Sequence, residues 1–134
     1  MTVLDASVVL KWVFDDEDGG GRALQLKEGH IAGDDVIAVP DLLFYEVANV
    51  LATKTRLSEK DCAEAFQLLW GFELEQFDFG REEFVKALHL ARHHAITVYD
   101  AAYVELSRKL RCRFVTADRR LYEKVKKMEL VELL

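Results

Sequence analysis

The sequence predicts a three-layer α/β/α domain in which a parallel sheet of five strands has helices on both faces. The 134 residues suit one compact domain, residues 1–134, and the hydrophobic fraction of 51% is ample for a core. Short apolar runs alternate with longer segments whose apolar residues recur at helical spacing. Short strands separated by helices are typical of a parallel sheet that is covered on both faces.

In the first half of the chain, apolar runs mark two strands and helical spacing marks four helices. The first run ends at Asp5, and the second ends at Pro40, which has no N–H to donate to a sheet. The last of these helices begins at Ser58, which together with Asp61 has the pattern of a capping box. The expected elements are a strand at 2–4, helices at 6–14 and 22–30, a strand at 36–39, and helices at 41–56 and 58–72.

The second half continues the alternation with three strands and three helices. One helix has Phe84, Leu88 and Ala91 at helical spacing, so we expect these side chains to face the core. Asp100 opens the helix after it. The expected elements are a strand at 74–77, helices at 81–94 and 99–110, a strand at 113–116, a helix at 119–127 and a strand at 130–133.

Composition excludes several classes of protein. No apolar run approaches the roughly 18 residues of a membrane span, and the opening residues have no signal-peptide cleavage site. Cys62 and Cys112 lack the spacing of a thiolate metal site, which favours free thiols in a reducing compartment. We therefore expect a cytoplasmic protein that makes no membrane contact.

Four carboxylates stand in or at the end of apolar runs: Asp5, Glu46, Asp100 and Asp118. Burying a charge is costly without a partner, and Asp5 has no basic residue within one helical turn. Taken singly, each acid could be a helix cap or a hydrogen-bonded core acid. Because independent buried acids are rare, four together favour one shared site.

Other acids have partners at the spacing of ordinary helix ion pairs. Glu105 has Lys109 four residues on, and Glu123 has Lys127, so we expect both pairs to be exposed and worth a few tenths of a kcal/mol. This contrast separates them from the four clustered acids.

Several carboxylates at one crevice suit a hard cation. The carboxyl ends of parallel strands meet at one edge of the sheet, where ligands bind, and Asp5 and Asp118 follow two of the expected strands. Oxygen ligands favour Mg²⁺ or Mn²⁺, which can activate water and stabilise a phosphate being cleaved. Ser7 and Thr116 flank these acids and could orient them, or could satisfy backbone groups instead.

Four segments carry a family resemblance: residues 3–7 (VLDAS), 45–51 (YEVANVL), 97–101 (TVYDA) and 116–121 (TADRRL). In this order and spacing they resemble the PIN domain as found in VapC toxins of toxin-antitoxin modules. The resemblance implies strand order 3-2-1-4-5, an endoribonuclease dependent on Mg²⁺ or Mn²⁺, a homodimer, and an antitoxin that inhibits it. PIN nucleases of RNA processing, outside toxin-antitoxin pairs, remain an alternative.

The motifs also imply roles for individual residues. The catalytic, metal-binding acids would be Asp5, Glu46, Asp100 and Asp118, with Ser7, Thr116 and Asn49 supporting them, and Lys11 would contact RNA.

The charge distribution bears on RNA binding. The net charge of −6 argues against general nucleic-acid affinity, yet residues 108–127 hold nine basic residues against two acidic ones. These basic residues flank Asp118, so we expect phosphate contacts to hold RNA near the acids, and Arg119 and Arg120 follow Asp118 directly.

Three other interpretations compete with the four-acid site: a zinc site, a metal-binding loop and a phosphoacceptor module. His89, His93 and His94 include an i, i+4 pair that could hold zinc, but no third ligand is evident. The acidic run at 15–18 stands beside three glycines, which is typical of a solvated loop rather than a metal loop. A phosphoacceptor signalling module, with Asp78 as acceptor, has similar size, but the expected pair of acids after the first strand is missing.

Overall fold

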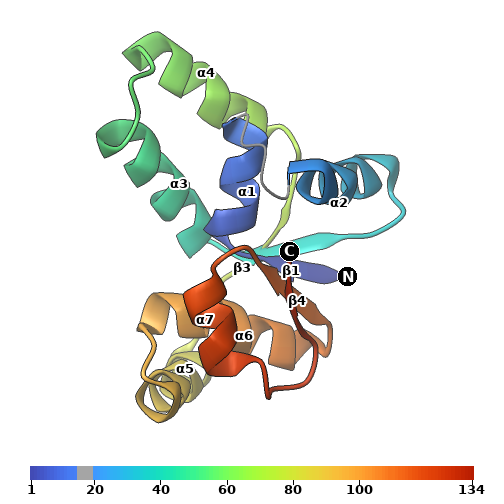
Figure 1. Ribbon diagram of the computed structural model, residues 1–134, viewed down its shortest axis with the longest axis vertical. Coiled ribbons are helices and arrows are strands. Elements are labelled where there is room, and N and C mark those ends of the chain that lie inside the picture. Colours follow the sequence, from blue (N-terminus) through green and yellow to red (C-terminus); the bar gives the residue numbers. More distant parts are fainter. Residues whose placement is uncertain (15–19) are drawn as a thin grey trace.

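The structure is a computed structural model that describes residues 1–14 and 20–134 (Figure 1). The acidic run at 15–18 lies outside the described residues, so its loop stays a prediction. The elements in chain order are β1 (Thr2–Leu4), α1 (Ala6–Val13), α2 (Gly20–Ala32), β2 (Ile37–Pro40), α3 (Leu42–Thr53), α4 (Glu59–Trp70), β3 (Glu75–Phe77), α5 (Arg81–His94), α6 (Val98–Leu110), β4 (Arg113–Thr116), α7 (Arg119–Val125) and β5 (Val131–Leu133).

All described strands form one parallel sheet in the order β3-β2-β1-β4-β5, which confirms the predicted fold and strand order. The central strand β1 pairs with β2 and β4, and Val3 lies beside Ala38 and Phe114. These three side chains are fully buried, so the sheet centre is the core of the fold.

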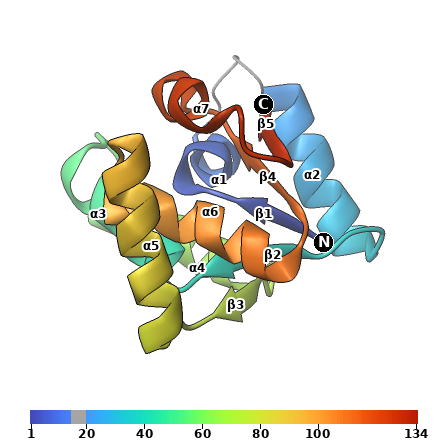
Figure 2. The same cartoon turned by 90° about the horizontal axis from the view of Figure 1, so that it is seen from below.

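The helices form two layers. Figure 1 shows α1 to α4 on one side of the sheet and α5, α6 and α7 on the other. Helix α6 lies against β1, β2 and β4, and α5 packs on α6 (Figure 2). Because α6 lies between the sheet and α5, its residues from Ala101 to Ser107 are all buried. This helix carries side chains both to the acid cluster and to the opposite helix.

The predicted orientation of α5 is wrong for two of its three residues. Phe84 and Leu88 are 56% and 51% exposed, whereas Ala87, Leu90 and Ala91 are buried. Small alanines let α5 approach α6 closely, because the separation of packed helices depends on the side chains at the contact. The larger apolar residues are therefore left on the solvent side.

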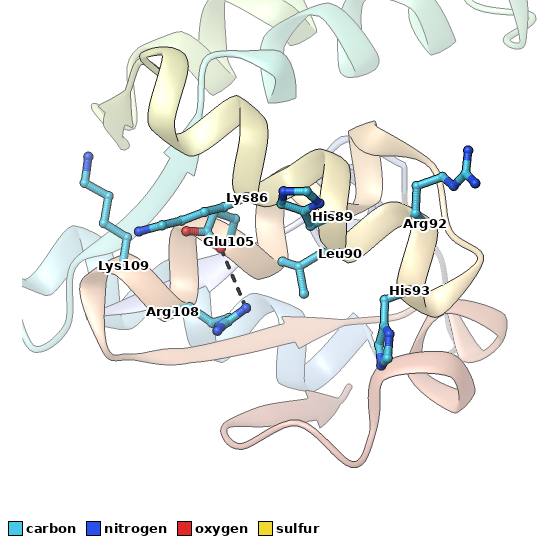
Figure 3. A pocket seen from close by; sticks show the side chains of 8 residues that line it. All are labelled: Lys86, His89, Leu90, Arg92, His93, Glu105, Arg108 and Lys109. Atoms are coloured by element: carbon cyan, nitrogen blue, oxygen red, sulfur yellow. Dashed lines mark ion pairs between the residues drawn. The ribbon is translucent and has the colours of Figure 1, made fainter.

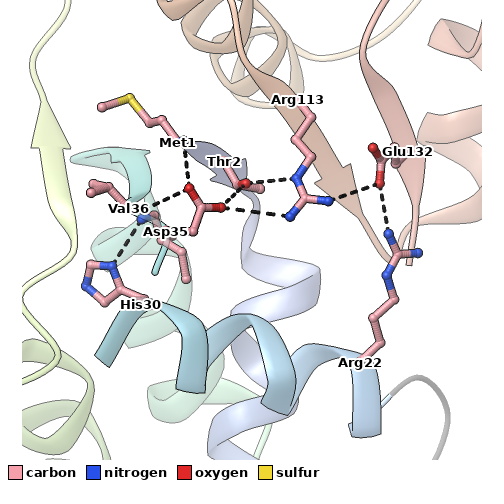
Figure 4. A network of polar contacts seen from close by, with 9 residues as sticks. Met1, Thr2, Arg22, His30, Asp35, Val36, Arg113 and Glu132 are labelled. Atoms are coloured by element: carbon pink, nitrogen blue, oxygen red, sulfur yellow. Dashed lines mark hydrogen bonds and ion pairs between the residues drawn. The ribbon is translucent and has the colours of Figure 1, made fainter. Parts of the chain in front are cut away.

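A polar network ties together the amino ends of the strands (Figure 4). The Met1 amino group lies 2.6 Å from Asp35 Oδ1, and the Thr2 hydroxyl donates to Asp35 Oδ2 at 2.5 Å. The same hydroxyl accepts from Arg113 Nε at 2.9 Å. Arg113 thus binds Thr2 and Asp35 at the sheet edge opposite the carboxyl ends of the strands. The expectation that the whole basic stretch flanks Asp118 is therefore wrong for this residue.

Cys62 and Cys112 are both free thiols, as predicted. Across the described ranges, no helix is long and apolar enough to cross a membrane.

Candidate active site

Asp5 ends β1 and is the N-cap of α1, where it is only 5% exposed. The Ser7 hydroxyl donates to its Oδ1, and the Thr116 hydroxyl, from the end of β4, donates to its Oδ2 at 2.5 Å. The Val8 N–H makes a long contact of 3.4 Å to Oδ1. Asp5 is therefore a helix cap, which was one expectation for each acid taken singly, and its carboxylate is also held by hydroxyls from α1 and β4.

Backbone groups fix the direction of both hydroxyls. Ser7 Oγ accepts from the Ala117 N–H at 2.8 Å, and Thr116 Oγ1 accepts from the Asp118 N–H at 3.0 Å. Each hydroxyl oxygen accepts from a backbone N–H, and each hydroxyl donates its own proton to Asp5. The supporting roles proposed for Ser7 and Thr116 agree with this geometry.

Burial raises the pKa of Asp5 from 3.8 to about 6. The hydrogen bonds from Ser7, Thr116 and Val8 favour the ionised form, but they offset only part of the desolvation, and the charge of Asp100 adds to the rise. Asp5 is thus ionised at neutral pH at a cost in stability, which a nearby cation would reduce.

Asp100 and Asp118 come from the start of α6 and of α7. Asp118 is exposed and caps α7, its Oδ1 accepting from the Leu121 N–H at 3.1 Å. Asp100 does not cap α6, because that position belongs to Thr97, whose Oγ1 accepts from the Asp100 N–H at 3.0 Å. Burial, followed by the charge of Asp118, raises the pKa of Asp100, while Lys124 opposes the rise.

Glu46 reaches the cluster from α3 and is held by a tyrosine that the sequence analysis missed. The Tyr103 hydroxyl donates to Glu46 Oε1 at 2.5 Å, and its buried ring stacks on Phe114 with centroids 6.2 Å apart. Burial raises the pKa of Tyr103, so the hydroxyl keeps its proton, and burial and Asp100 raise the pKa of Glu46. The sequence contained one signal for this role, because Tyr103 stands one helical turn after Asp100 on the same helix.

Asp100 lies within electrostatic reach of each of the other three predicted acids. Its charge raises the pKa of both Asp5 and Glu46, and Asp118 in turn raises that of Asp100. In the part of the chain that is described, no group of three or more His, Cys, Asp or Glu side chains is placed to hold a metal ion. The acids thus form an open cluster.

This open, all-oxygen cluster fits Mg²⁺ or Mn²⁺. Mg²⁺ is usually held by one or two carboxylates and keeps several waters, so a closed cage is not required. A carboxylate has about four acceptor positions, and the contacts of Asp5 with Ser7, Val8 and Thr116 leave room for one more.

The remaining predicted residues lie on helices that carry one of the acids or are capped by one. Arg119 and Arg120 are exposed in the first turn of α7, directly after Asp118. Asn49 is exposed on α3 one turn after Glu46, and Lys11 is half-buried on α1.

Basic residues of the 108–127 stretch do not share one face. Lys109 pairs with Glu83 of α5 at 2.5 Å, and Lys126 pairs with Glu123 at 2.5 Å, in addition to Arg113 at the opposite sheet edge. The predicted pairs of Glu105 with Lys109 and of Glu123 with Lys127 are therefore wrong in their partners.

The model of the PIN domain family matches residues 2–127. This chain belongs to the PIN domain family. Ribonuclease VapC3 of Pyrobaculum aerophilum is 41% identical over 88 residues, which span 63% of this PIN domain and 67% of that protein. A toxin-antitoxin complex from Klebsiella pneumoniae contains a chain with a TM-score of 0.72 at 11% identity, covering 98% of this chain and 96% of that one. The sarcin-ricin loop cleaving toxin VapC20 of Mycobacterium tuberculosis has a TM-score of 0.67 at 15% identity, covering 92% and 94%. Both structural similarities concern the fold.

Two of the three rival sites can be compared with the residues that the structure describes, and neither finds support there. The sheet order differs from the 2-1-3-4-5 order of phosphoacceptor modules, and Asp78 follows the edge strand β3. The rings of His93 and His94 meet edge to face with centroids 4.8 Å apart, but neither they nor His89 belongs to a metal-binding group within the described ranges.

Proposed function

We propose that residues 1–134 act in the cytoplasm as a single-domain endoribonuclease of the VapC toxin type, which hydrolyses RNA phosphodiester bonds with Mg²⁺ or Mn²⁺. The observation that carries this proposal is the meeting of four acids, each from a different element of the PIN fold, with Asp100 coupled to the other three. The likeness to Ribonuclease VapC3 supports RNA as the substrate.

Asp5, Glu46, Asp100 and Asp118 would hold the metal. A divalent ion, when bound, lowers the pKa of a water and offsets the charge that develops on the phosphate. The same positive charge would offset the burial, and the repulsion by neighbouring acids, that together raise the pKa values of Asp5, Glu46 and Asp100.

The surrounding residues orient these acids. Ser7 and Thr116 each donate one proton to Asp5, which limits rotation of its carboxylate. Tyr103 donates to Glu46 and is itself fixed by its stacking on Phe114. Such fixed geometry favours reaction because the groups need little rearrangement in the transition state.

RNA would approach over α7 and the neighbouring ends of α1 and α3. Arg119 and Arg120 lie next to Asp118 and would contact phosphates on either side of the cleaved bond. Lys11 would add a further phosphate contact, and Asn49 would support the acids from α3.

We also propose an antitoxin protein as partner. Helices α3 and α4 form an apolar groove of about 360 Å³ lined by Tyr45, Phe66 and Trp70, and Tyr45 and Trp70 are 75% and 53% exposed. Exposed aromatic patches of this kind mark protein interaction sites. The complex from Klebsiella pneumoniae, which shares the fold, supports this partner class.

A homodimer is proposed as well. Phe84, Val85 and Leu88 form an exposed apolar stripe on α5 that a second copy could cover. Light scattering at high protein concentration should give a dimeric mass, and a monomeric mass would contradict this proposal.

Cleavage of single-stranded RNA tests the proposed function. We expect cleavage with Mg²⁺ or Mn²⁺, reversible loss with EDTA, and loss in each of Asp5→Asn, Glu46→Gln, Asp100→Asn and Asp118→Asn. Glu64→Gln, which removes an exposed acid from α4, is the matched control and should retain activity. Cleavage that persists in EDTA and in all four variants would show that this cluster is not the active site.

A further inference from the structure

A second polar groove lies between α5 and α6, on residues that the acid cluster does not use (Figure 3). Its volume is about 810 Å³. Four cations line it, Lys86 and Arg92 from α5 and Arg108 and Lys109 from α6, around a single carboxylate, Glu105. Such a concentration of positive charge is unexpected in a chain with a net charge of −6.

Glu105 lies at the base of the groove with an unsatisfied acceptor. The residue is 3% exposed, and within the described ranges its Oε2 has no hydrogen-bond partner. Arg108 Nη1 is 3.9 Å away, which is too long for a hydrogen bond (Figure 3). Burial raises the pKa of Glu105. A buried acceptor without a donor costs free energy, so the groove lacks a donor that a ligand could supply.

The cations around Glu105 are only partly neutralised. Lys86 pairs with Glu82 at 3.2 Å in an exposed contact, and Lys109 pairs with Glu83. The exposed pair of Lys86 contributes little and exchanges readily for other partners. Arg92 has no ion pair among the residues that the structure describes, so it and Arg108 are the cations most available to an anionic ligand.

The ligand that fits must combine negative charge with N–H donors. A nucleotide of single-stranded RNA has both, because its phosphate suits a guanidinium and its base carries N–H groups on an exposed edge. Carboxylates accept from such groups, as in their contacts with the amino group of cytosine. The side chains of an acidic peptide supply the charge, but its N–H donors are main-chain groups, which do not stand on an exposed edge as those of an unpaired base do.

We propose that the α5–α6 groove binds an uncleaved segment of single-stranded RNA, with phosphates on Arg92 and Arg108 and a base N–H donating to Glu105 Oε2. The inference rests on the proposed ribonuclease function, which it extends by a second contact region. Arg108 follows Asp100 by eight residues on α6, a rise of about 12 Å at 1.5 Å per residue. In this proposal the short axial separation lets one RNA strand contact both sites.

Binding without turnover tests the groove. Fluorescence anisotropy of a labelled single-stranded RNA, measured in EDTA against salt concentration, compares wild type with the double variant Arg92→Ala, Arg108→Ala. Losing two phosphate contacts should lower the salt slope by about 1.4, since each contact on a single strand contributes about 0.7. Lys60→Ala, which removes an exposed cation from α4, is the matched control and should leave the slope unchanged. An unchanged slope in the double variant would overturn the proposal.

The base contact has its own test. Glu105→Gln keeps the side-chain size but replaces an acceptor with a donor, so we expect a changed preference among oligo(A), oligo(C), oligo(G) and oligo(U), with the same salt slope. Equal preferences in variant and wild type would refute the base contact. A double variant that loses affinity for poly-glutamate but retains RNA binding would assign the groove to an acidic protein instead.

Failure of the groove and failure of the ribonuclease function are distinguishable. If RNA is cleaved normally and binding ignores the groove variants, only the groove proposal is wrong. If no RNA is cleaved but binding depends on Arg92 and Arg108, the groove stands and the catalytic proposal is wrong.

Discussion

Asp5→Asn should stabilise the metal-free protein above pH 6, although it removes a residue proposed to be catalytic. Burial raises the pKa of Asp5 from 3.8 to about 6, a rise of about two units. At about 1.4 kcal/mol per unit, ionising Asp5 in the folded state costs about 3 kcal/mol at neutral pH. The asparagine carries no charge and avoids this cost.

Part of the gain is lost in hydrogen bonding. Asparagine keeps one acceptor oxygen but presents an NH₂ group in place of the other, so one of the hydroxyls of Ser7 and Thr116 loses its acceptor. The 3.3 Å contact between these two hydroxyls offers the displaced proton a weak alternative. With a cost of about 1–2 kcal/mol, the expected net stabilisation is roughly 1–2 kcal/mol.

The pH dependence identifies the cause. Between about pH 4 and pH 6 the folded wild type binds more protons than its unfolded chain, so its stability falls as pH rises through this window. The variant lacks this group, so its advantage should appear above pH 6 and disappear, or reverse, near pH 4.

Urea denaturation in EDTA from pH 4 to pH 8 measures the difference, with Glu64→Gln as an exposed control that should follow wild type throughout. A variant that is no more stable than wild type above pH 6, or a difference that ignores pH, would refute this account of Asp5.

Three further predictions concern neighbouring residues. Asp100→Asn should stabilise the metal-free protein near neutral pH by about 1 kcal/mol, because burial and Asp118 raise its pKa, and thermal melts should show a smaller gain from Mn²⁺ than in wild type. Tyr103→Phe removes the donor to Glu46, so the pKa of Glu46 should rise further, and the acid limb of the pH–rate profile should move to higher pH; an unmoved limb would exclude this coupling. Replacing Arg119 and Arg120 together with alanine should weaken RNA binding and reduce its salt slope, and an unchanged slope in anisotropy titrations would contradict their phosphate contacts.

The sequence was sufficient for the sheet because its strands depend on local composition. Short runs such as residues 2–4 and 113–116 have few alternatives once they are apolar and bounded by turn or helix signals, and both have the predicted bounds in the structure. For helix α5, local composition was not sufficient to predict which face is buried. Its apolar residues allow two overlapping faces, and only the close approach of α6 selects Ala87 over Phe84.

The candidate site divides in the same way. The four acids could be selected because each interrupts or ends an apolar run, and apolar context is visible in the sequence. The hydrogen bond from Tyr103 to Glu46 could not be predicted from the sequence, since it joins α6 to α3 and depends on how the two helices pack.

Glu105 shows most clearly why local spacing cannot assign charge partners. Lys109 stands four residues on, where an exposed ion pair is the ordinary expectation, yet its ammonium group binds Glu83 of α5. Helix α6 is covered by the sheet on one side and by α5 on the other, so Glu105 is buried while Lys109 can reach the neighbouring helix. An i, i+4 pair contributes only a few tenths of a kcal/mol, which is too little to hold Lys109 against a short contact offered by another element. The packing of α5 on α6 thus outweighs a weak local preference. Among the described residues it leaves Glu105 Oε2 without a hydrogen-bond donor, and this is the acceptor to which we assign a ligand.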